Sequence, residues 1–223
     1  SNIDIFVIGN VISRGNPLME YILTKGYRYC SGPDFLYEHI LRNKQVIAVS
    51  GTHGKTSVSA MTSKIFLDQH PETGYLIAGE TKDFPSSSRL GSGDFFVLEA
   101  DEYDSAFFDK RSKFIHYRPK TLLINNLEFD HADIFNDLSD IQQQYSQLLR
   151  TLASDACVIY PNSDLNIEAL FKKDFFSKTR TFSFEQDVIK ISQLNNYGSK
   201  FEVFRSDESF GEVNWELIGE HNL

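Results

Sequence analysis

A glycine-rich segment from Gly51 to Ser57 contains the residues that phosphate binding needs. Its glycines let the backbone turn so that successive N–H groups point at one place, and a helix starting there adds partial positive charge. Lys55 brings a full charge for the β- and γ-phosphates of a nucleotide, and the Thr56 hydroxyl is placed to bind Mg²⁺. The general motif G-x-x-x-x-G-K-[ST] has a glycine where this chain has Val49, so the loop here is shorter. The alternative is a glycine-rich turn with a surface lysine, which the strand before the segment and the helix after it disfavour.

An acidic segment, Glu99 to Asp104, follows the apolar run 95–98. In open α/β sheets, ligands bind beyond the carboxyl ends of the strands, and an acid there can hold Mg²⁺ opposite a phosphate loop. Taken alone, this segment is slightly better explained as a solvated acidic turn than as a metal site. A phosphate loop in the same chain favours a metal-binding role for Glu99.

Two further segments have less specific residue patterns. A polar cluster at 125–133 follows the apolar run 121–124 and includes His131. Mg²⁺ prefers oxygen ligands and Mn²⁺ tolerates imidazole better, so the residue types leave His131 open between a metal ligand and a structural histidine. The stretch 107–120 mixes aromatic residues with five Lys or Arg. It is either an exposed charged loop or a pocket for an anionic substrate.

The elements that must position these residues follow from the apolar pattern. Short apolar runs predict buried strands at 5–8, 45–49, 95–98, 121–124 and 157–160. Helical spacing predicts helices at 17–25, at 35–41 with Asp34 as N-cap, at 55–70, and at 139–152 starting from Asp137 or Ser139. Alternating strands and helices predict a doubly wound, mostly parallel α/β sheet. Polar and apolar residues alternate at 201–205 and 213–217, which predicts a small antiparallel hairpin around 206–211.

Composition excludes several classes of protein. The chain has 223 residues, with 22 Lys and Arg against 31 Asp and Glu, so its net charge is −9. That sign argues against a general nucleic-acid binder and against a protein that binds anionic membranes. The two cysteines, Cys30 and Cys157, are too far apart for a metal motif or a disulfide framework, so we expect reduced thiols and a cytoplasmic location. The chain starts without Met and stops without a closing element, from which we expect a piece of a longer protein.

Together these motifs resemble the Mur ligase family, the ATP-dependent amide-forming enzymes of bacterial cell-wall synthesis. The segment Gly51–Thr56 is similar to the family's short phosphate loop, which accounts for the glycine missing at position 49. Glu99–Glu102 and Asp130–Asp133 resemble its two metal-site motifs. Gly219–Asn222 resembles a segment whose asparagine contacts adenine. The family resemblance implies ATP and Mg²⁺, or Mn²⁺, as cofactors.

The segments 15–17 together with 31–33, 99–117 and 125–135 most resemble one branch of that family. This branch joins the tripeptide L-alanyl-γ-D-glutamyl-meso-diaminopimelate to UDP-N-acetylmuramate in peptidoglycan recycling, through an acyl phosphate. Several branches of the family carry a carbamylated lysine on the helix after the histidine motif. No lysine lies between His131 and Arg150 here, so the resemblance favours the branches that act on UDP-N-acetylmuramate itself. Two alternatives stay open: a UDP-N-acetylmuramate–L-alanine ligase, and a nucleotide-binding or regulatory ATPase module without ligase activity.

The resemblance also implies a division of the chain and a role for each site residue. Residues 1–43 would be the last part of a UDP-sugar-binding N-terminal domain and residues 44–223 the central ATP-binding domain, inactive without the rest of the enzyme. The oligomeric state is not predicted. The implied catalytic residues are Lys55, Glu99 and His131, and the implied metal ligands are Thr56, Glu99 and His131. The residues implied to bind ATP are Gly51, Thr52, His53, Gly54, Lys55, Thr56, Ser57 and Asn222. Those implied to bind substrate are His53, Lys110, Arg111 and Lys113.

Overall fold

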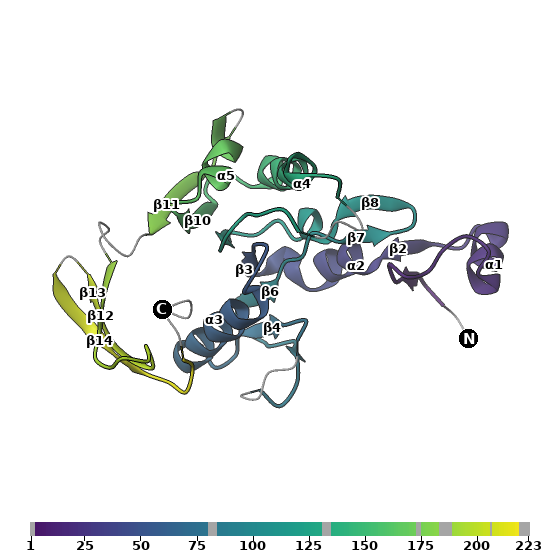
Figure 1. The fold of residues 1–223 in the computed structure, drawn as a ribbon. Helices are drawn as coiled ribbons and strands as arrows, with labels where there is room; N and C mark the ends of the chain where they lie inside the picture. Colours follow the sequence, from purple (N-terminus) through teal and green to yellow (C-terminus); the bar gives the residue numbers. More distant parts are fainter. Residues whose placement is uncertain are drawn as a thin grey trace.

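A computed structural model gives the fold, and it describes residues 3–79, 84–130, 135–172, 175–182, 189–205 and 207–218. A central sheet with helices on both faces occupies the middle of the molecule (Figure 1). A small N-terminal unit, coloured purple, lies at one end, and a small antiparallel sheet, coloured yellow, lies at the other. No helix in these described ranges has both the length and the apolar character needed to cross a membrane.

The central sheet has seven strands in the order β11-β10-β9-β3-β6-β4-β5. Every neighbouring pair is parallel except β4 and β5. The strand bounds are β3 Gln45–Ser50, β4 Gly74–Leu76, β5 Ser88–Arg89, β6 Phe95–Glu99, β9 Thr121–Ile124, β10 Cys157–Pro161 and β11 Lys178–Phe182. The prediction of a doubly wound, mostly parallel sheet is therefore confirmed, and the apolar runs located its central strands to within one residue.

Helices cover both faces of this sheet because β3 is apolar on both sides. Ile47 faces α3 (Lys55–Gln69), in a cluster that includes Ala60 and Phe66. Val46 and Ala48 face the opposite way, in the cluster that contains the inner face of α4 (Leu138–Thr151). A strand buried on both faces reads as a continuous apolar run, which is why the pattern at 45–49 was so clear.

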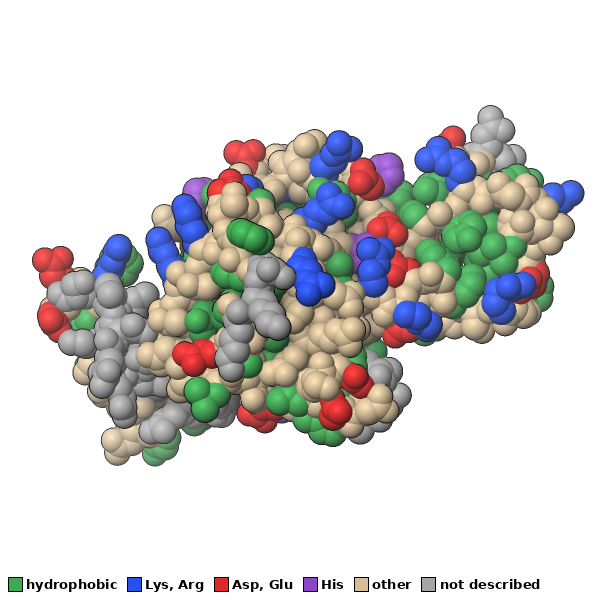
Figure 2. Space-filling model, turned by 90° about the horizontal axis from the view of Figure 1, so that it is seen from above, with side chains coloured by type: hydrophobic (Ala, Val, Ile, Leu, Met, Phe, Trp, Pro, Cys, Tyr) green, Lys and Arg blue, Asp and Glu red, His purple; other side chains and the backbone are tan. Residues whose placement is uncertain are grey.

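The N-terminal unit has its own two-stranded parallel sheet, β1 (Phe6–Ile8) and β2 (Tyr29–Ser31), separate from the central one. Helix α1 (Pro17–Lys25) begins and ends as predicted, and Gly26 closes it with a left-handed φ of 64°. Helix α2 (Gly32–His39) and a 3₁₀ turn, η1 (Leu41–Asn43), lead into β3. Apolar side chains are exposed at this end of the molecule, as Figure 2 shows, among them Val11 and Leu18.

The predicted N-cap of α2 was wrong. Ser31 occupies that position, and its hydroxyl accepts a hydrogen bond of 3.2 Å from the Asp34 N–H. Asp34 instead lies in the first turn, where a carboxylate is favoured by the helix dipole. Both residue types cap helices well, so the sequence could not decide between them.

The antiparallel region has three strands: β12 (Ile189–Gln193), β13 (Lys200–Arg205) and β14 (Glu208–Asn214). The first strand of the predicted hairpin is confirmed. The second was wrong, because β14 starts at Glu208 and the expected turn residues 208–211 belong to it. Most of β14 is exposed on both faces, so no apolar alternation marks its position. Strand β12 was not predicted at all.

Two small elements separate β6 from β9. Strands β7 (Asp104–Ala106) and β8 (Asp109–Ser112) form a hairpin, and the 3₁₀ turn η2 (Lys113–His116) follows. A further helix, α5 (Leu165–Glu168), and the 3₁₀ turn η3 (Ala169–Lys172) lie between β10 and β11.

Candidate active site

The candidate site forms where three strands end side by side. Strand β3 pairs with β6 on one side and β9 on the other, all parallel, so their carboxyl ends share one edge of the sheet. The glycine-rich segment follows β3, Glu99 ends β6, and Asn125 follows β9. After β3 the chain continues toward β4, whereas after β6 it returns to the other side of β3. Such a reversal of strand order is where open α/β sheets bind ligands.

The start of α3 has no capping side chain. Its N-cap is Gly54, which offers no side-chain acceptor to the N–H groups of the first turn. The other α-helices in the described ranges are each capped by a side chain: Asn16, Ser31, Asp137 and Asp164. The first turn of α3 therefore presents uncapped N–H groups and the positive end of the helix dipole, an arrangement that suits an anion.

Two loop positions require glycine. Gly51 has φ 139°, and a Cβ there would lie 3.1 Å from the backbone N and O of Asn126. Gly54 has φ 77°, and its Cβ would lie 2.9 Å from the Asn125 side-chain nitrogen. A side chain at either position would be strained and crowded, so the glycines allow the loop to lie directly against the segment after β9.

Two asparagines after β9 hold the glycine-rich loop in place. Asn126 accepts a hydrogen bond of 2.8 Å from the His53 N–H. Asn125 and Asn126 both donate to the His53 carbonyl oxygen, at 3.0 and 3.2 Å. The 125–133 segment was singled out from the sequence for His131, and these two asparagines were assigned no role. The sequence feature that could have pointed to them is their position: they are polar residues directly after a strand that pairs with β3.

Lys55 lies inside the loop that it was predicted to serve. Its ammonium group donates to the carbonyl oxygens of Gly51 at 2.8 Å and Thr52 at 3.3 Å, and to Glu102 Oε1 at 3.2 Å. The Lys55 side chain is 13% exposed and that of Glu102 is 4% exposed. Sequence reasoning did not assign Glu102 a role, although it lies in the acidic segment that was singled out.

Glu99 and Thr56, both predicted as metal ligands, lie together. The Thr56 hydroxyl donates to Glu99 Oε1 at 3.1 Å, and the Ala78 N–H donates to Glu99 Oε2 at 3.0 Å. A carboxylate and a hydroxyl oxygen beside a phosphate-type loop are the hard oxygen donors that Mg²⁺ prefers. This donor set therefore fits the metal that the family resemblance implies.

A buried pair supports the loop from below. The Tyr145 hydroxyl on α4 and Ser50 Oγ at the end of β3 lie 2.6 Å apart. Burial, and next the negative charge of Glu102, raise the pKa of Tyr145 well above its usual range, so this phenol stays protonated. The pair ties α4 to the end of β3 directly before Gly51.

The predicted substrate residues of the 107–120 stretch have acidic partners. Lys110 pairs with Asp104, Arg111 with Asp109 and Lys113 with Asp101. On the face seen in Figure 2, Lys and Arg side chains lie scattered, several of them beside Asp or Glu. An anionic substrate would have to compete with these carboxylates for the basic groups.

Three of the remaining predicted residues lie in the loop or the first turn of α3, and two lie outside the part of the chain that the structure describes. Thr52 is buried, and its hydroxyl bonds the backbone of Glu128. His53 and Ser57 are exposed at the loop and the first turn of α3. His131 and Asn222, predicted to bind metal and adenine, lie outside the described residues.

Comparison with known proteins identifies the family. The family model of the Mur ligase middle domain matches residues 49–223. The UDP-N-acetylmuramate--L-alanyl-gamma-D-glutamyl-meso-2,6-diaminoheptandioate ligase of Escherichia coli is 45% identical over 99% of this chain and 48% of that protein. The UDP-N-acetylmuramate--L-alanine ligase of Clostridium botulinum is 28% identical over 99% of this chain and 47% of that protein.

A solved structure gives the same result. The crystal structure of the UDP-N-acetylmuramate:L-alanyl-gamma-D-glutamyl-meso-diaminopimelate ligase from Neisseria meningitides matches with a TM-score of 0.88 and 41% identity, over 98% of this chain and 70% of that chain. The chain spans about half the length of the curated relatives it matches. With its short phosphate loop, its Glu99–Thr56 pair and a family match over most of its length, the chain belongs to the Mur ligase family.

Proposed function

We propose that this chain carries the ATP-binding site of a ligase that joins L-alanyl-γ-D-glutamyl-meso-diaminopimelate to UDP-N-acetylmuramate. The observation that carries the proposal is the uncapped start of α3, with Lys55, Thr56 and Glu99 at the meeting point of three parallel strands. Identity of 45% to a protein named for this reaction supports the tripeptide over L-alanine as the amine, since the L-alanine ligase is 28% identical.

Each part of the site then has a task toward ATP. The loop from Gly51 to Lys55 and the first turn of α3, including Ser57, would hold the phosphates, as in other phosphate loops. Thr56 and Glu99 would hold Mg²⁺, which when bound neutralises phosphate charge. The His131 and Asn222 roles, and Mn²⁺ as an alternative ion for a histidine ligand, remain part of the proposal.

The proposed chemistry has two transfers. A carboxylate oxygen of UDP-N-acetylmuramate attacks the γ-phosphorus of ATP and ADP leaves, which gives an acyl phosphate. The peptide amine then attacks the acyl carbon and phosphate leaves, so that an amide forms. In both steps the described residues would position groups and neutralise charge, and the Lys55 ammonium group inside the loop would neutralise charge on the transferred phosphoryl group.

The N-terminal unit would hold the sugar nucleotide in this scheme. We propose that residues 1–43 belong to a UDP-sugar-binding domain and residues 44–223 to the ATP-binding domain. The separate β1–β2 sheet and the end of η1 at Asn43 support that boundary. His53 is exposed on the loop and is the site residue we propose to face the sugar nucleotide.

The test is phosphate release by the full-length protein with ATP, Mg²⁺ and UDP-N-acetylmuramate, supplied with either the tripeptide or L-alanine. We expect release to depend on the sugar nucleotide and to favour the tripeptide by at least tenfold in kcat/KM. A preference for L-alanine would assign the protein to the alanine-adding branch instead. Hydrolysis that needs neither the acid nor the amine would favour a regulatory ATPase module.

A further inference from the structure

We propose that residues 104–118, which we call the brace, fix the orientation of the N-terminal unit against the central sheet, with His116 as the central positioning residue. The brace comprises β7, β8, η2 and the two residues that follow η2. It contacts the N-terminal unit at three separate places. The link to the sugar nucleotide rests on the proposed function, but the mechanical role does not.

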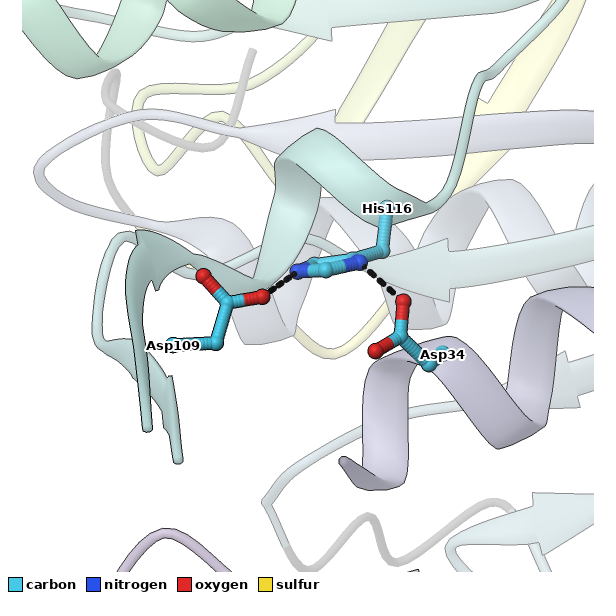
Figure 3. A group of neighbouring side chains, drawn as sticks. All are labelled: Asp34, Asp109 and His116. Carbon is cyan, nitrogen blue, oxygen red and sulfur yellow. Dashed lines mark ion pairs between the residues drawn. The ribbon is translucent and has the colours of Figure 1, made fainter. Parts of the chain in front are cut away.

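The first contact is an imidazole held between two carboxylates (Figure 3). His116 Nδ1 lies 2.6 Å from Asp34 Oδ1 on α2, and Nε2 lies 3.0 Å from Asp109 Oδ2 on β8. The His116 side chain is only 5% exposed. One buried ring thus lies between the N-terminal unit and the hairpin, with a carboxylate oxygen within ion-pair distance of each nitrogen.

Both carboxylates are themselves fixed by other groups. The Arg111 guanidinium donates two hydrogen bonds to Asp109, at 2.9 and 2.7 Å. The Ser31 hydroxyl, which caps α2, donates to the second oxygen of Asp34 at 3.0 Å. The ring therefore lies between anchored partners, and a shift of α2 relative to β8 would break at least one of its contacts.

The same three side chains resemble a metal-ligand set, because their ligand atoms lie within 4.8 Å of one another. The orientation of the ring argues against that role. A cation bound at one ring nitrogen would face only the carboxylate on that side, since Asp34 and Asp109 lie at opposite nitrogens. Arg111 also occupies both oxygens of Asp109.

The second contact is apolar and lies at the tip of the hairpin. Phe107 packs against the buried cluster of the N-terminal unit, which contains Ile8, Met19 and Ile22. Phe108 stands edge-on to Tyr29 of β2, with ring centroids 5.0 Å apart. The tip thus completes the small core of a unit to which it is not adjacent in sequence.

The third contact follows η2. The Arg118 guanidinium lies 4.6 Å from the ring centre of Tyr37 on α2 and donates to its hydroxyl at 3.2 Å. Arg118 has φ 44° and precedes Pro119, a conformation that is strained for a residue with a side chain. The surrounding contacts hold the strained residue where it meets α2.

The far side of the brace is attached to the acidic segment of the active site. The Ser112 hydroxyl donates to the Glu102 carbonyl oxygen at 2.6 Å, and Lys113 pairs with Asp101 at 3.1 Å. Glu102 in turn pairs with Lys55. A continuous set of contacts therefore runs from the N-terminal unit to the phosphate-binding lysine.

The brace is tested by distance measurement between spin labels in the full-length protein. Labels go on the exposed Thr24 of α1 and Gln69 of α3, each replaced by cysteine, with native cysteines changed to serine. In His116→Ala and in Phe107→Ala we expect the width of the distance distribution at least to double. Glu38→Gln is the matched control, because it removes an exposed acid from α2 whose ion pair is with Arg42, outside the brace.

The outcomes separate the possibilities. Distributions as narrow as the parent's in both variants would overturn the brace. If His116→Ala does not fold, Asp34→Asn replaces it, because that change keeps the size of the side chain and removes only the charge. Broadening of the parent's distribution by EDTA, reversed by Zn²⁺, would show a metal site instead. None of these readouts depends on ligase activity. The distance distributions would therefore still test the brace if the protein did not catalyse the proposed reaction.

A second readout connects the brace to catalysis. In the full-length enzyme, His116→Ala is expected to raise KM for UDP-N-acetylmuramate at least fivefold and to leave the affinity for ADP unchanged. An equal loss for both ligands would indicate general destabilisation and would contradict the positioning role.

Discussion

The ammonium group of Lys55 lies 3.2 Å from Glu102, and this ion pair is almost fully buried. A phosphate that binds the loop must share the lysine with that carboxylate or displace it. The ion pair therefore keeps Lys55 folded into its own loop when no phosphate is bound, and the acidic segment influences the phosphate loop directly.

Replacing Glu102 tests this relationship. Glu102→Gln removes the carboxylate that pairs with the buried Lys55 ammonium group, so we expect the free energy of unfolding to fall by about 3–5 kcal/mol. The rise in Tm on adding ADP should become larger, because no carboxylate competes for the lysine. Urea unfolding and thermal shift measure the two effects. Asp68→Asn, which breaks the exposed Lys64–Asp68 pair on α3, should change stability by less than about 1 kcal/mol.

Two lysines on α3 offer a matched comparison. Lys55→Ala should lower kcat for phosphate release by about 10²-fold or more, because the proposed site loses the lysine charge that would stabilise the transferred phosphoryl group. Lys64→Ala, on the exposed part of the same helix, should leave turnover within twofold of the parent. Steady-state phosphate release measures both, and near-normal turnover in Lys55→Ala would contradict the phosphate-loop assignment.

The metal assignment predicts a particular dependence on Mg²⁺. Glu99→Ala removes the carboxylate that accepts from Thr56 and from the Ala78 N–H, so the Mg²⁺ concentration for half-maximal activity should rise at least tenfold. A Mg²⁺ titration at saturating ATP measures it. Activity with an unchanged Mg²⁺ requirement would remove Glu99 from the metal site.

Alanine substitutions at two glycines distinguish the effect of backbone strain from the effect of steric crowding. Gly51 (φ 139°) and Gly211 (φ 145°) have similar φ angles, but a Cβ at Gly211 meets nothing within 4 Å. Each change to alanine should cost about 1–3 kcal/mol in strain. Only Gly51→Ala should abolish stabilisation by ADP, because its Cβ pushes against Asn126. Equal ADP binding by both variants would show that the close approach is not needed.

One carboxylate predicts a pH effect in the N-terminal unit. The hydrogen bonds from Arg14, and next the Gly15 N–H, lower the pKa of Glu20 to about 2. A lowered pKa means that this carboxylate contributes stability above its unfolded value of about 4.3, and that the contribution is lost as pH falls toward 2. An NMR titration of Glu20 should show a midpoint near 2 in the parent. In Arg14→Gln the midpoint should return toward its usual value, and no change would contradict the pairing.

Much of the fold could be predicted from the sequence because it is carried by local patterns. The runs at 45–49 and 95–98 are buried on both faces, so composition alone marked them. Strand β14 could not be found this way, since most of its side chains are exposed. Ser31 rather than Asp34 caps α2 because the helix starts directly after β2, and the residue types alone do not show where it starts.

The structure brings the predicted motif residues Lys55, Thr56 and Glu99 to one edge of the sheet, and their roles stay predictions; their partners were missed. These three residues belong to short motifs, so their types and spacing were enough to single them out. Glu102 on Lys55 and Asn126 on His53 are contacts across the sheet edge, which only the tertiary fold creates. The pairing of Lys110, Arg111 and Lys113 with acids was likewise invisible in a count of charges.

The missing side-chain cap on α3 has a thermodynamic consequence. A phosphate bound at Gly54 would act as the cap, so nucleotide binding would stabilise the first helical turn and, with it, the folded state. At a nucleotide concentration a hundred times Kd, the folded state would gain about 2.7 kcal/mol. The stability of this protein, and its resistance to proteolysis, would then follow the nucleotide supply of the cell.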